Sequence, residues 1–237
     1  IEDPVEIRVP GVNQVQVNPQ AGLTFATALR AFLRQDPDVI MVGEIRDGET
    51  AELAIHAALT GHLVLATLHT NSASGAIPRL LDMGVEDYLL TSTINAVLAQ
   101  RLVRRICPHC KEEFAPPEEI QEQIRSTLHT LDPAKVATVT RDKGMIEALK
   151  KLNNQEIRVF RGKGCDKCEN TGYHGRIGIF EVLDVSQKIS EMILEHASSG
   201  KIQDQAISEN MITLEQDGMF RVLEGDTTLE EVMRVIK

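Results

Sequence analysis

The residue best placed to do chemistry is Glu44, which follows four consecutive large apolar residues, 39–42, and a glycine that ends the run. A carboxylate in that position can hold magnesium or orient a water molecule for attack on a phosphate. The stretch therefore predicts an edge that handles a nucleotide phosphate and a metal ion. An ordinary strand that ends in solvated charge explains this stretch alone equally well.

Three further carboxylates lie near the start of the chain, where Glu2, Asp3 and Glu6 surround Pro4. Pro4 keeps Asp3 out of helical geometry, and Ile1 is expected to be the last residue of a strand. The sequence thus places a second acidic cluster at the end of a second predicted strand.

Two histidines, His62 and His69, bracket another apolar run. Their separation of seven positions would put them on opposite faces of a regular strand, so one of them is expected to lie in a turn. A lone histidine is more often structural than reactive, but a histidine at a strand exit favours a phosphate sensor.

Four cysteines give the second strong pattern, in which Cys107 with Cys110 and Cys165 with Cys168 form two CxxC pairs separated by residues 111–164. Two such turns can present four thiolates to one tetrahedral zinc ion. His109 could replace one ligand, although four cysteines make it unnecessary. Disulfides are the alternative.

The elements that position these residues follow from their apolar periodicity. Residues 39–42 predict a strand buried on both faces of a parallel α/β sheet, whose ligands bind beyond the carboxyl ends of its strands. An alanine-rich helix at residues 48–60 stops near Gly61 and makes a right-handed crossover to the histidine strand. A helix at residues 24–34, capped by Thr24, buries an apolar stripe made of Phe25, Leu29, Phe32 and Leu33.

The connecting and later segments are predicted in the same way. Residues 5–17 indicate a short hairpin, and residues 72–83 and 87–101 indicate two helices. The basic run 101–105 is interpreted as a solvated helix end in preference to a partner surface. Residues 135–152 can form an amphipathic helix within an insertion that reaches about Asn154. Strands at 157–160 and 177–182 flank the second cysteine pair, and three apolar helical faces after Ser186, broken at Gly200 and Gly225, predict a small helical bundle.

Composition limits the possible functions. The 237 residues contain 42% hydrophobic residues but no run near the ~20 apolar residues that span a bilayer. A net charge of -10 argues against nucleic-acid binding through broad phosphate neutralisation. No charged leader precedes an apolar segment, so nothing indicates export.

Three motifs in order resemble those of the ATPases of type II secretion and type IV pilus assembly. Residues 1–6 resemble the aspartate box of this family, residues 36–47 its Walker B segment and residues 60–71 its histidine box. Assembly ATPases carry a tetracysteine motif that retraction ATPases generally lack, so the cysteines select the assembly or secretion branch. The cytosolic setting implied here favours zinc over disulfides.

The resemblance implies a RecA-like P-loop NTPase domain of α/β class in a ring of six subunits. It implies that Glu2 is the general base, that Glu44 supports Mg2+, and that His62, His69 and Arg46 sense the nucleotide. It also implies ATP as substrate, a cytoplasmic location at the inner membrane face, and docking on an inner-membrane platform protein. The expected division is a partial RecA-like core at 1–106, a tetracysteine zinc subdomain at 107–183 and a helical domain at 184–237.

One family feature is missing, because the sequence has no GxxxxGK[ST] phosphate loop. We therefore expect a carboxy-terminal portion that is inactive by itself. The main alternative is a zinc-stabilised adaptor without ATPase activity, which leaves the acidic residues and histidines unexplained. A metallohydrolase would need three converging ligands, and no HExxH spacing is present.

Overall fold

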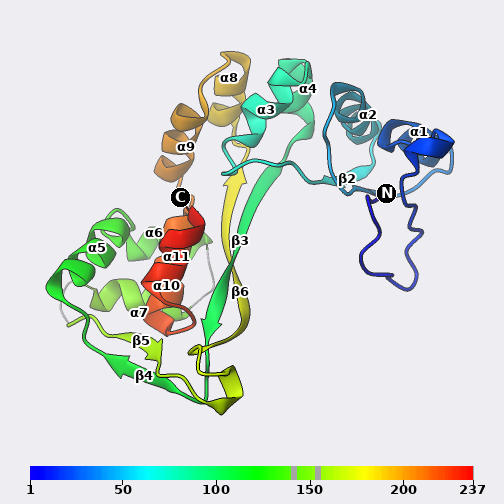
Figure 1. Ribbon diagram of the computed structural model, residues 1–237. Helices are drawn as coiled ribbons and strands as arrows, with labels where there is room; N and C mark the ends of the chain where they lie inside the picture. Colours follow the sequence, from blue (N-terminus) through cyan, green and yellow to red (C-terminus); the bar gives the residue numbers. More distant parts are fainter. Residues whose placement is uncertain (140–142, 153–155, 237) are drawn as a thin grey trace. The chain divides into compact units, whose positions relative to one another are not determined.

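The computed structural model describes residues 1–139, 143–152 and 156–236 (Figure 1). Contacts divide the chain into two compact units, residues 1–97 with 184–205 and residues 98–183 with 206–237. The domain boundaries at 106 and 183 stay predictions.

The first unit contains the parallel strands β1 (Val39–Val42) and β2 (Leu63–Ala66), connected by helix α2 (Gly48–Leu59). Helix α1 packs on α2, and α2 contacts both β2 and α4 (Figure 1). This parallel pair with its connecting helix confirms the predicted α/β class. The other helical elements of the unit are η1 (Pro19–Ala21), α1 (Phe25–Leu33), α3 (Ala76–Asp82), α4 (Asp87–Thr93), α8 (Gln187–Leu194) and most of α9 (Ser199–Ser208).

Local signals fix the ends of these helices. The Thr24 hydroxyl accepts the Thr27 N–H at 3.2 Å and caps α1, as predicted. Asp47 caps α2 in the same way, accepting the Thr50 N–H at 2.8 Å. Gly61 follows α2 with a φ of +101°, a backbone conformation that favours glycine.

Burial of β1 on both faces is a wrong prediction. Ile40 and Val42 are buried, whereas Val39 and Met41 are each 54% exposed. Leu63 and Leu65 of β2, which pair with those two exposed residues, are also about half exposed. The described helices of this unit cover one face of the strand pair. The continuous apolar run of β1 was therefore not sufficient evidence that the other face is buried too.

The hairpin predicted at residues 5–17 is also absent from the described structure. Glutamine side chains hold this loop in place of a ladder: Gln14 Oε1 accepts the Val9 N–H at 2.7 Å, and Gln16 Oε1 accepts the Val5 N–H at 3.2 Å. The loop does contain a turn at Pro10 and Gly11, where Gly11 has a φ of +82°.

The helix predicted at residues 87–101 ends at Thr93, and strand β3 (Ala96–Ile106) follows. The basic run 101–105 therefore lies in a strand and not at a helix end. Alternate residues of β3 differ in exposure, and the strand pairs with the distant β6 (Tyr173–Asp184). A partner far away in the sequence overrides the local helical pattern.

The second unit combines β3 and β6 with an antiparallel pair, β4 (Lys111–Phe114) and β5 (Val159–Gly162). Strands β5 and β6 confirm the two strands predicted around the second cysteine pair. Its buried core is centred on Phe220 and Met219, with Ile124 and Leu128 from helix α5. The helical elements of the unit are α5 (Glu118–Leu128), α6 (Pro133–Val139), α7 (Lys143–Lys151), η2 (Asp166–Cys168), α10 (Leu214–Glu224) and α11 (Leu229–Ile236).

The predicted helix at 135–152 corresponds to α6 and α7, while residues 140–142 and the insertion end at Asn154 lie outside the described residues. Met145, Leu149 and Leu152 are buried in the core of the second unit, so this amphipathic face packs within that unit.

Four helices follow Ser186 in the described chain, α8 to α11. Gly225 ends α10 with a φ of +74°, as predicted, whereas Gly200 lies inside α9 and breaks nothing. Because α8 groups with the first unit and α10 with the second, the contacts do not confirm a separate helical domain.

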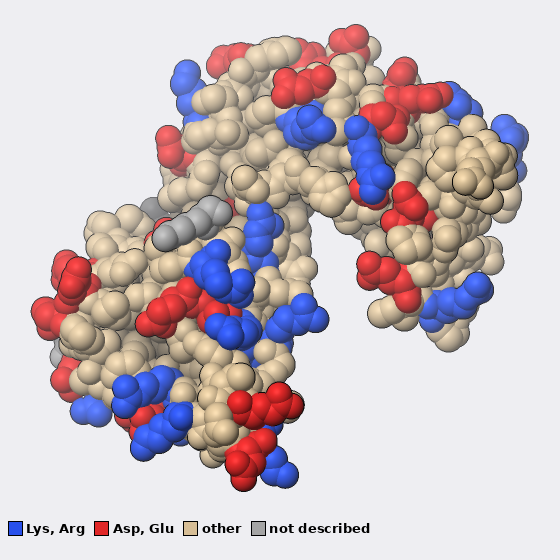
Figure 2. Space-filling view, in the orientation of Figure 1, with Lys and Arg blue, Asp and Glu red and all other residues tan. Residues whose placement is uncertain are grey.

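No helix among the described residues is long and apolar enough to cross a bilayer. On the face shown in Figure 2, basic and acidic side chains are interspersed. Arg161 of β5 and Glu112 of β4 form an ion pair at 2.7 Å.

Two glycines let the backbone segments beside the cysteines pass close to each other. A Cβ atom on Gly162 would lie 2.1 Å from the Gly172 carbonyl oxygen, and one on Gly172 would lie 2.6 Å from the Gly162 oxygen. Neither backbone can yield as a flexible side chain could, so this crossing requires residues without a Cβ.

We therefore expect Gly162→Ala to lower the free energy of unfolding by about 1–3 kcal/mol, the usual cost of overpacking. Gly200→Ala is the matched control, because its Cβ meets nothing within 4 Å and its helix favours alanine. Urea unfolding measures both changes. Equal stability of the two variants would contradict the close crossing.

Candidate functional site

The β1–β2 pairing continues beyond both strands and brings Glu44 and His69 together. The Thr67 N–H donates to the Val42 carbonyl at 3.3 Å, and the Ile45 N–H donates to the Thr67 carbonyl at 2.9 Å. Both predicted site residues therefore lie at the carboxyl edge of the parallel pair, where ligands of such sheets bind.

Glu44 is only 8% exposed, and a nitrogen-bearing side chain contacts each of its oxygens. Arg46 Nη2 contacts Oε1 at 2.5 Å, and His69 Nε2 contacts Oε2 at 2.9 Å. The hydrogen bond from Arg46, supported by His69, holds the Glu44 pKa below its usual value against the opposing effect of burial. The carboxylate thus stays charged and available to a cation.

The amino-terminal acidic cluster lies beside the same strand end. The Ile1 nitrogen donates to the Met41 carbonyl at 2.8 Å, and the Gly43 N–H donates to the Ile1 carbonyl at 2.8 Å. These two hydrogen bonds place Ile1 beside the end of β1. A Cβ on Gly43 would lie 3.2 Å from the Glu2 Cα, so glycine permits the close approach of Glu2.

Asp3 and Gln14 complete the arrangement. Asp3 Oδ2 lies 3.6 Å from Arg46 Nη1, so Arg46 contacts both acidic clusters. Gln14 Nε2 donates to Glu2 Oε1 at 2.8 Å and fixes the orientation of that carboxylate. Sequence reasoning missed Gln14, because one glutamine in an irregular loop carries no pattern.

These residues border one pocket of about 1020 Å³, which is large enough for a nucleotide. Its polar lining includes Glu2, Asp3, Glu44, Arg46 and His69. Apart from the cysteines, five site residues were predicted, and four of them, Glu2, Glu44, Arg46 and His69, line this pocket. Asp3 lines it as well.

His62 is the exception. It precedes β2, and its Nδ1 lies 2.9 Å from the Ala57 carbonyl and 3.1 Å from the Thr60 hydroxyl. It therefore stabilises the turn that follows α2, and the whole of β2 lies between it and the end where His69 is found. This agrees with the prediction that one histidine lies in a turn.

The four cysteines converge in the second unit, with ligand sulfur atoms all within 4.8 Å of one another. Sulfur distances are 3.9 Å from Cys107 to Cys165, 3.8 Å from Cys110 to Cys168 and 3.7 Å from Cys165 to Cys168. Four sulfurs at about 2.3 Å from a tetrahedral zinc ion lie about 3.8 Å apart. The four cysteines are free thiols, and among the described residues the group does not include His109.

The antiparallel β4–β5 ladder explains this convergence across a long insertion. Lys111 pairs with Gly162, and the Lys163 N–H donates to the Cys110 carbonyl at 3.0 Å. The Cys107 N–H donates to the Gly172 carbonyl at 2.9 Å. Residues between the strands can therefore extend the loop without moving the cysteine pairs.

Backbone N–H groups favour the thiolate form of one of the four cysteines, Cys168. Burial opposes ionisation of Cys168, but the N–H groups of Cys165 and Gly172, at 3.2 and 3.3 Å from its sulfur, help to lower its pKa to about 6. The donor set, spacing and sulfur environment fit a closed structural zinc site.

For the carboxylate site, we predict that the Glu44 pKa rises when Arg46 is replaced by methionine, since the largest cause of its lowering is removed. Arg79→Met, at an exposed position of helix α3, is the control and should leave the Glu44 pKa unchanged. Carboxyl carbon NMR titration measures both. An unchanged Glu44 pKa in Arg46→Met would contradict the ion pair.

Comparisons with known proteins agree with this geometry. The sequence profile of the family described as "Type II/IV secretion system protein" matches residues 1–234. The chain is 52% identical over 233 residues to the type IV pilus assembly ATPase PilB of Thermus thermophilus, covering 98% of this chain and 24% of that protein. It is 45% identical over 238 residues to the type II secretion system ATPase E of Vibrio cholerae, covering 100% of this chain and 42% of that protein.

Solved structures support the same fold. The pilus retraction motor PilT with bound ADP matches with a TM-score of 0.62 and 28% identity, covering 99% of this chain and 50% of that one. The ATPase DotB of Legionella pneumophila matches with a TM-score of 0.58 and 18% identity, covering 99% of this chain and 49% of that one, which shows the fold alone.

The chain thus spans less than half the length of these two curated relatives. A profile match over almost every residue and an identity of 52% nevertheless decide the family. The chain belongs to the type II/IV secretion system protein family.

Proposed function

We propose that this chain is the carboxy-terminal part of a magnesium-dependent ATPase that powers type IV pilus assembly or type II secretion. The observation that carries the proposal is the convergence of Glu2, Glu44, Arg46 and His69 on one pocket at the edge of a parallel strand pair. The names of the relatives, an assembly ATPase and a secretion ATPase, support the same activity.

Glu2 and Glu44 have different surroundings, which suit them to different roles. Glu2, oriented by Gln14, is exposed enough to reach a water molecule and accept its proton as general base. Glu44 would hold magnesium directly or through water, because its lowered pKa keeps the carboxylate charged. When bound, magnesium supplies positive charge to the terminal phosphates of ATP.

His69 and Arg46 respond to the nucleotide. Both contact the Glu44 oxygens, the atoms that would hold magnesium. On leaving Glu44, either side chain would be able to contact phosphate, and this exchange would couple the state of the nucleotide to movement. A sensing role for His62 has less geometric support, since its ring is engaged in the α2–β2 turn.

ATP hydrolysis also requires a phosphate-binding loop. These 237 residues contain no GxxxxGK[ST] sequence that could form one. A RecA-like core, a ring of six subunits and docking on an inner-membrane platform protein belong to the same proposal. They rest on the family resemblance.

For the four cysteines we propose structural zinc. Metal binding would contribute folding free energy and stiffen the base of the β4–β5 ladder. The sulfur spacing supports this assignment.

ATP turnover tests the motor. In the full-length protein with magnesium, Glu2→Gln and Glu44→Gln should each lower turnover at least 100-fold, in the range of a lost general base or charge clamp. Glu86→Gln is the control, since Glu86 is exposed and outside the pocket. The 237-residue chain should show no turnover. Hydrolysis that persists in both site variants would refute the roles of Glu2 and Glu44, and no turnover by the full-length protein would favour the adaptor alternative.

Metal analysis tests the zinc site. The purified chain should contain one zinc per molecule, and cobalt substitution should give the absorption of four thiolate ligands. Cys110→Ser should lose the metal and lower the unfolding temperature, whereas His109→Ala should retain it, because exposed His109 is outside the cysteine group. Cysteines without metal in freshly purified, reduced protein would refute zinc.

A further inference from the structure

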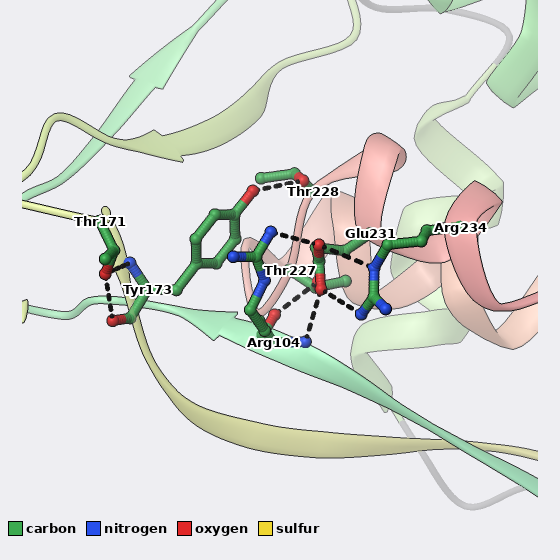
Figure 3. Close-up of polar contacts among 7 residues, drawn as sticks. All are labelled: Arg104, Thr171, Tyr173, Thr227, Thr228, Glu231 and Arg234. Atoms are coloured by element: carbon green, nitrogen blue, oxygen red, sulfur yellow. Dashed lines mark hydrogen bonds and ion pairs between the residues drawn. The ribbon is translucent and has the colours of Figure 1, made fainter.

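Glu231 of helix α11 is a buried carboxylate that belongs to neither site, and its side chain is only 3% exposed (Figure 3). Its Oε1 accepts Arg104 Nη2 at 2.6 Å and Arg234 Nε at 3.2 Å. Its Oε2 accepts the Arg104 backbone N–H at 3.0 Å and Arg234 Nη2 at 2.9 Å. Two of these four donors come from Arg104 of strand β3, so the buried carboxylate ties α11 to that strand.

The Arg104 guanidinium also lies against the Tyr173 ring, with its central carbon 4.2 Å from the ring centre. Tyr173 extends across to the start of α11, where its hydroxyl lies 3.0 Å from the Thr228 hydroxyl. Thr227 donates to the Arg104 carbonyl at 2.8 Å. Figure 3 shows these side chains as one connected group between β3, β6 and α11.

The same group is attached to the cysteine cluster. The Thr171 hydroxyl donates to the Cys168 carbonyl, 2.6 Å away, and accepts the Tyr173 N–H at 3.3 Å. Between them, Gly172 contributes its N–H to the Cys168 sulfur and its carbonyl to the Cys107 N–H. Residues 168–173 thus connect Cys168, a proposed metal ligand, to the Tyr173 ring that lies against Arg104.

We propose that the Glu231 network couples metal binding at the four cysteines to the docking of helix α11, so that each strengthens the other. Without metal, the segment from Cys168 to Tyr173 loses its anchor, and the ring no longer fixes Arg104. Glu231 is then a buried charge with weakened partners, which is costly unless α11 moves away. The coupling is reciprocal by thermodynamic necessity.

This inference rests on the proposed zinc site, and the experiment separates the two. Hydrogen exchange of the α11 amides is measured on the whole chain, zinc-loaded and after chelation. Zinc release to a chelating dye is measured on the wild type, Glu231→Gln and Tyr173→Phe. Glu230→Gln is the matched control, because Glu230 is exposed on the same helix.

We expect chelation to speed exchange of the α11 amides by about tenfold, within the usual range of coupling. Glu231→Gln should speed zinc release by a similar factor, Tyr173→Phe by less and Glu230→Gln not at all. Bound zinc whose removal leaves α11 exchange unchanged in the wild type would overturn the coupling alone, even where Glu231→Gln fails to fold. A chain that takes up no zinc would overturn both the zinc site and the coupling.

Discussion

A charged carboxylate is stable away from water only where hydrogen-bond donors surround it. In the first unit, Glu44 is such a carboxylate. Buried at the end of β1, it needs Arg46 and His69, which brings the end of β2 to the same place. Arg46 in turn contacts Asp3, and the glycine before Glu44 admits Glu2. One buried charge thus organises the edge at which we propose that ATP and magnesium bind.

The second unit meets the same constraint at Glu231, where two arginines and a backbone N–H surround one carboxylate. The Glu231 pKa is lowered to about 2, chiefly by Arg104. The stabilisation is therefore complete above the usual glutamate pKa and is lost as pH falls towards 2. Helix α11 is held by charge as well as by the apolar core that contains Val232.

Much of both sites could be predicted from residue type and order. The cysteine pairs, Glu44, His69 and the cap at Thr24 depend on local sequence or short-range geometry, and the structure places them as such rules require. The strand at residues 96–106, which begins inside the helix predicted at 87–101, could not be foreseen, because its partner strand β6 lies far along the sequence. Gln14 and Glu231 were missed for a similar reason, since their partners come together only after folding.

The central claim is that Glu2, Glu44 and His69 surround one cation and nucleotide site, while His62 lies at the other end of a strand that alone spans about 13 Å. Paramagnetic broadening by Mn2+ tests this most directly, in the full-length protein with a non-hydrolysable ATP analogue. The account predicts strong broadening of the Glu2, Glu44 and His69 side-chain signals, with the His62 ring much less affected. Equal broadening of the two histidines, or sharp Glu44 signals with Mn2+ bound, would contradict it.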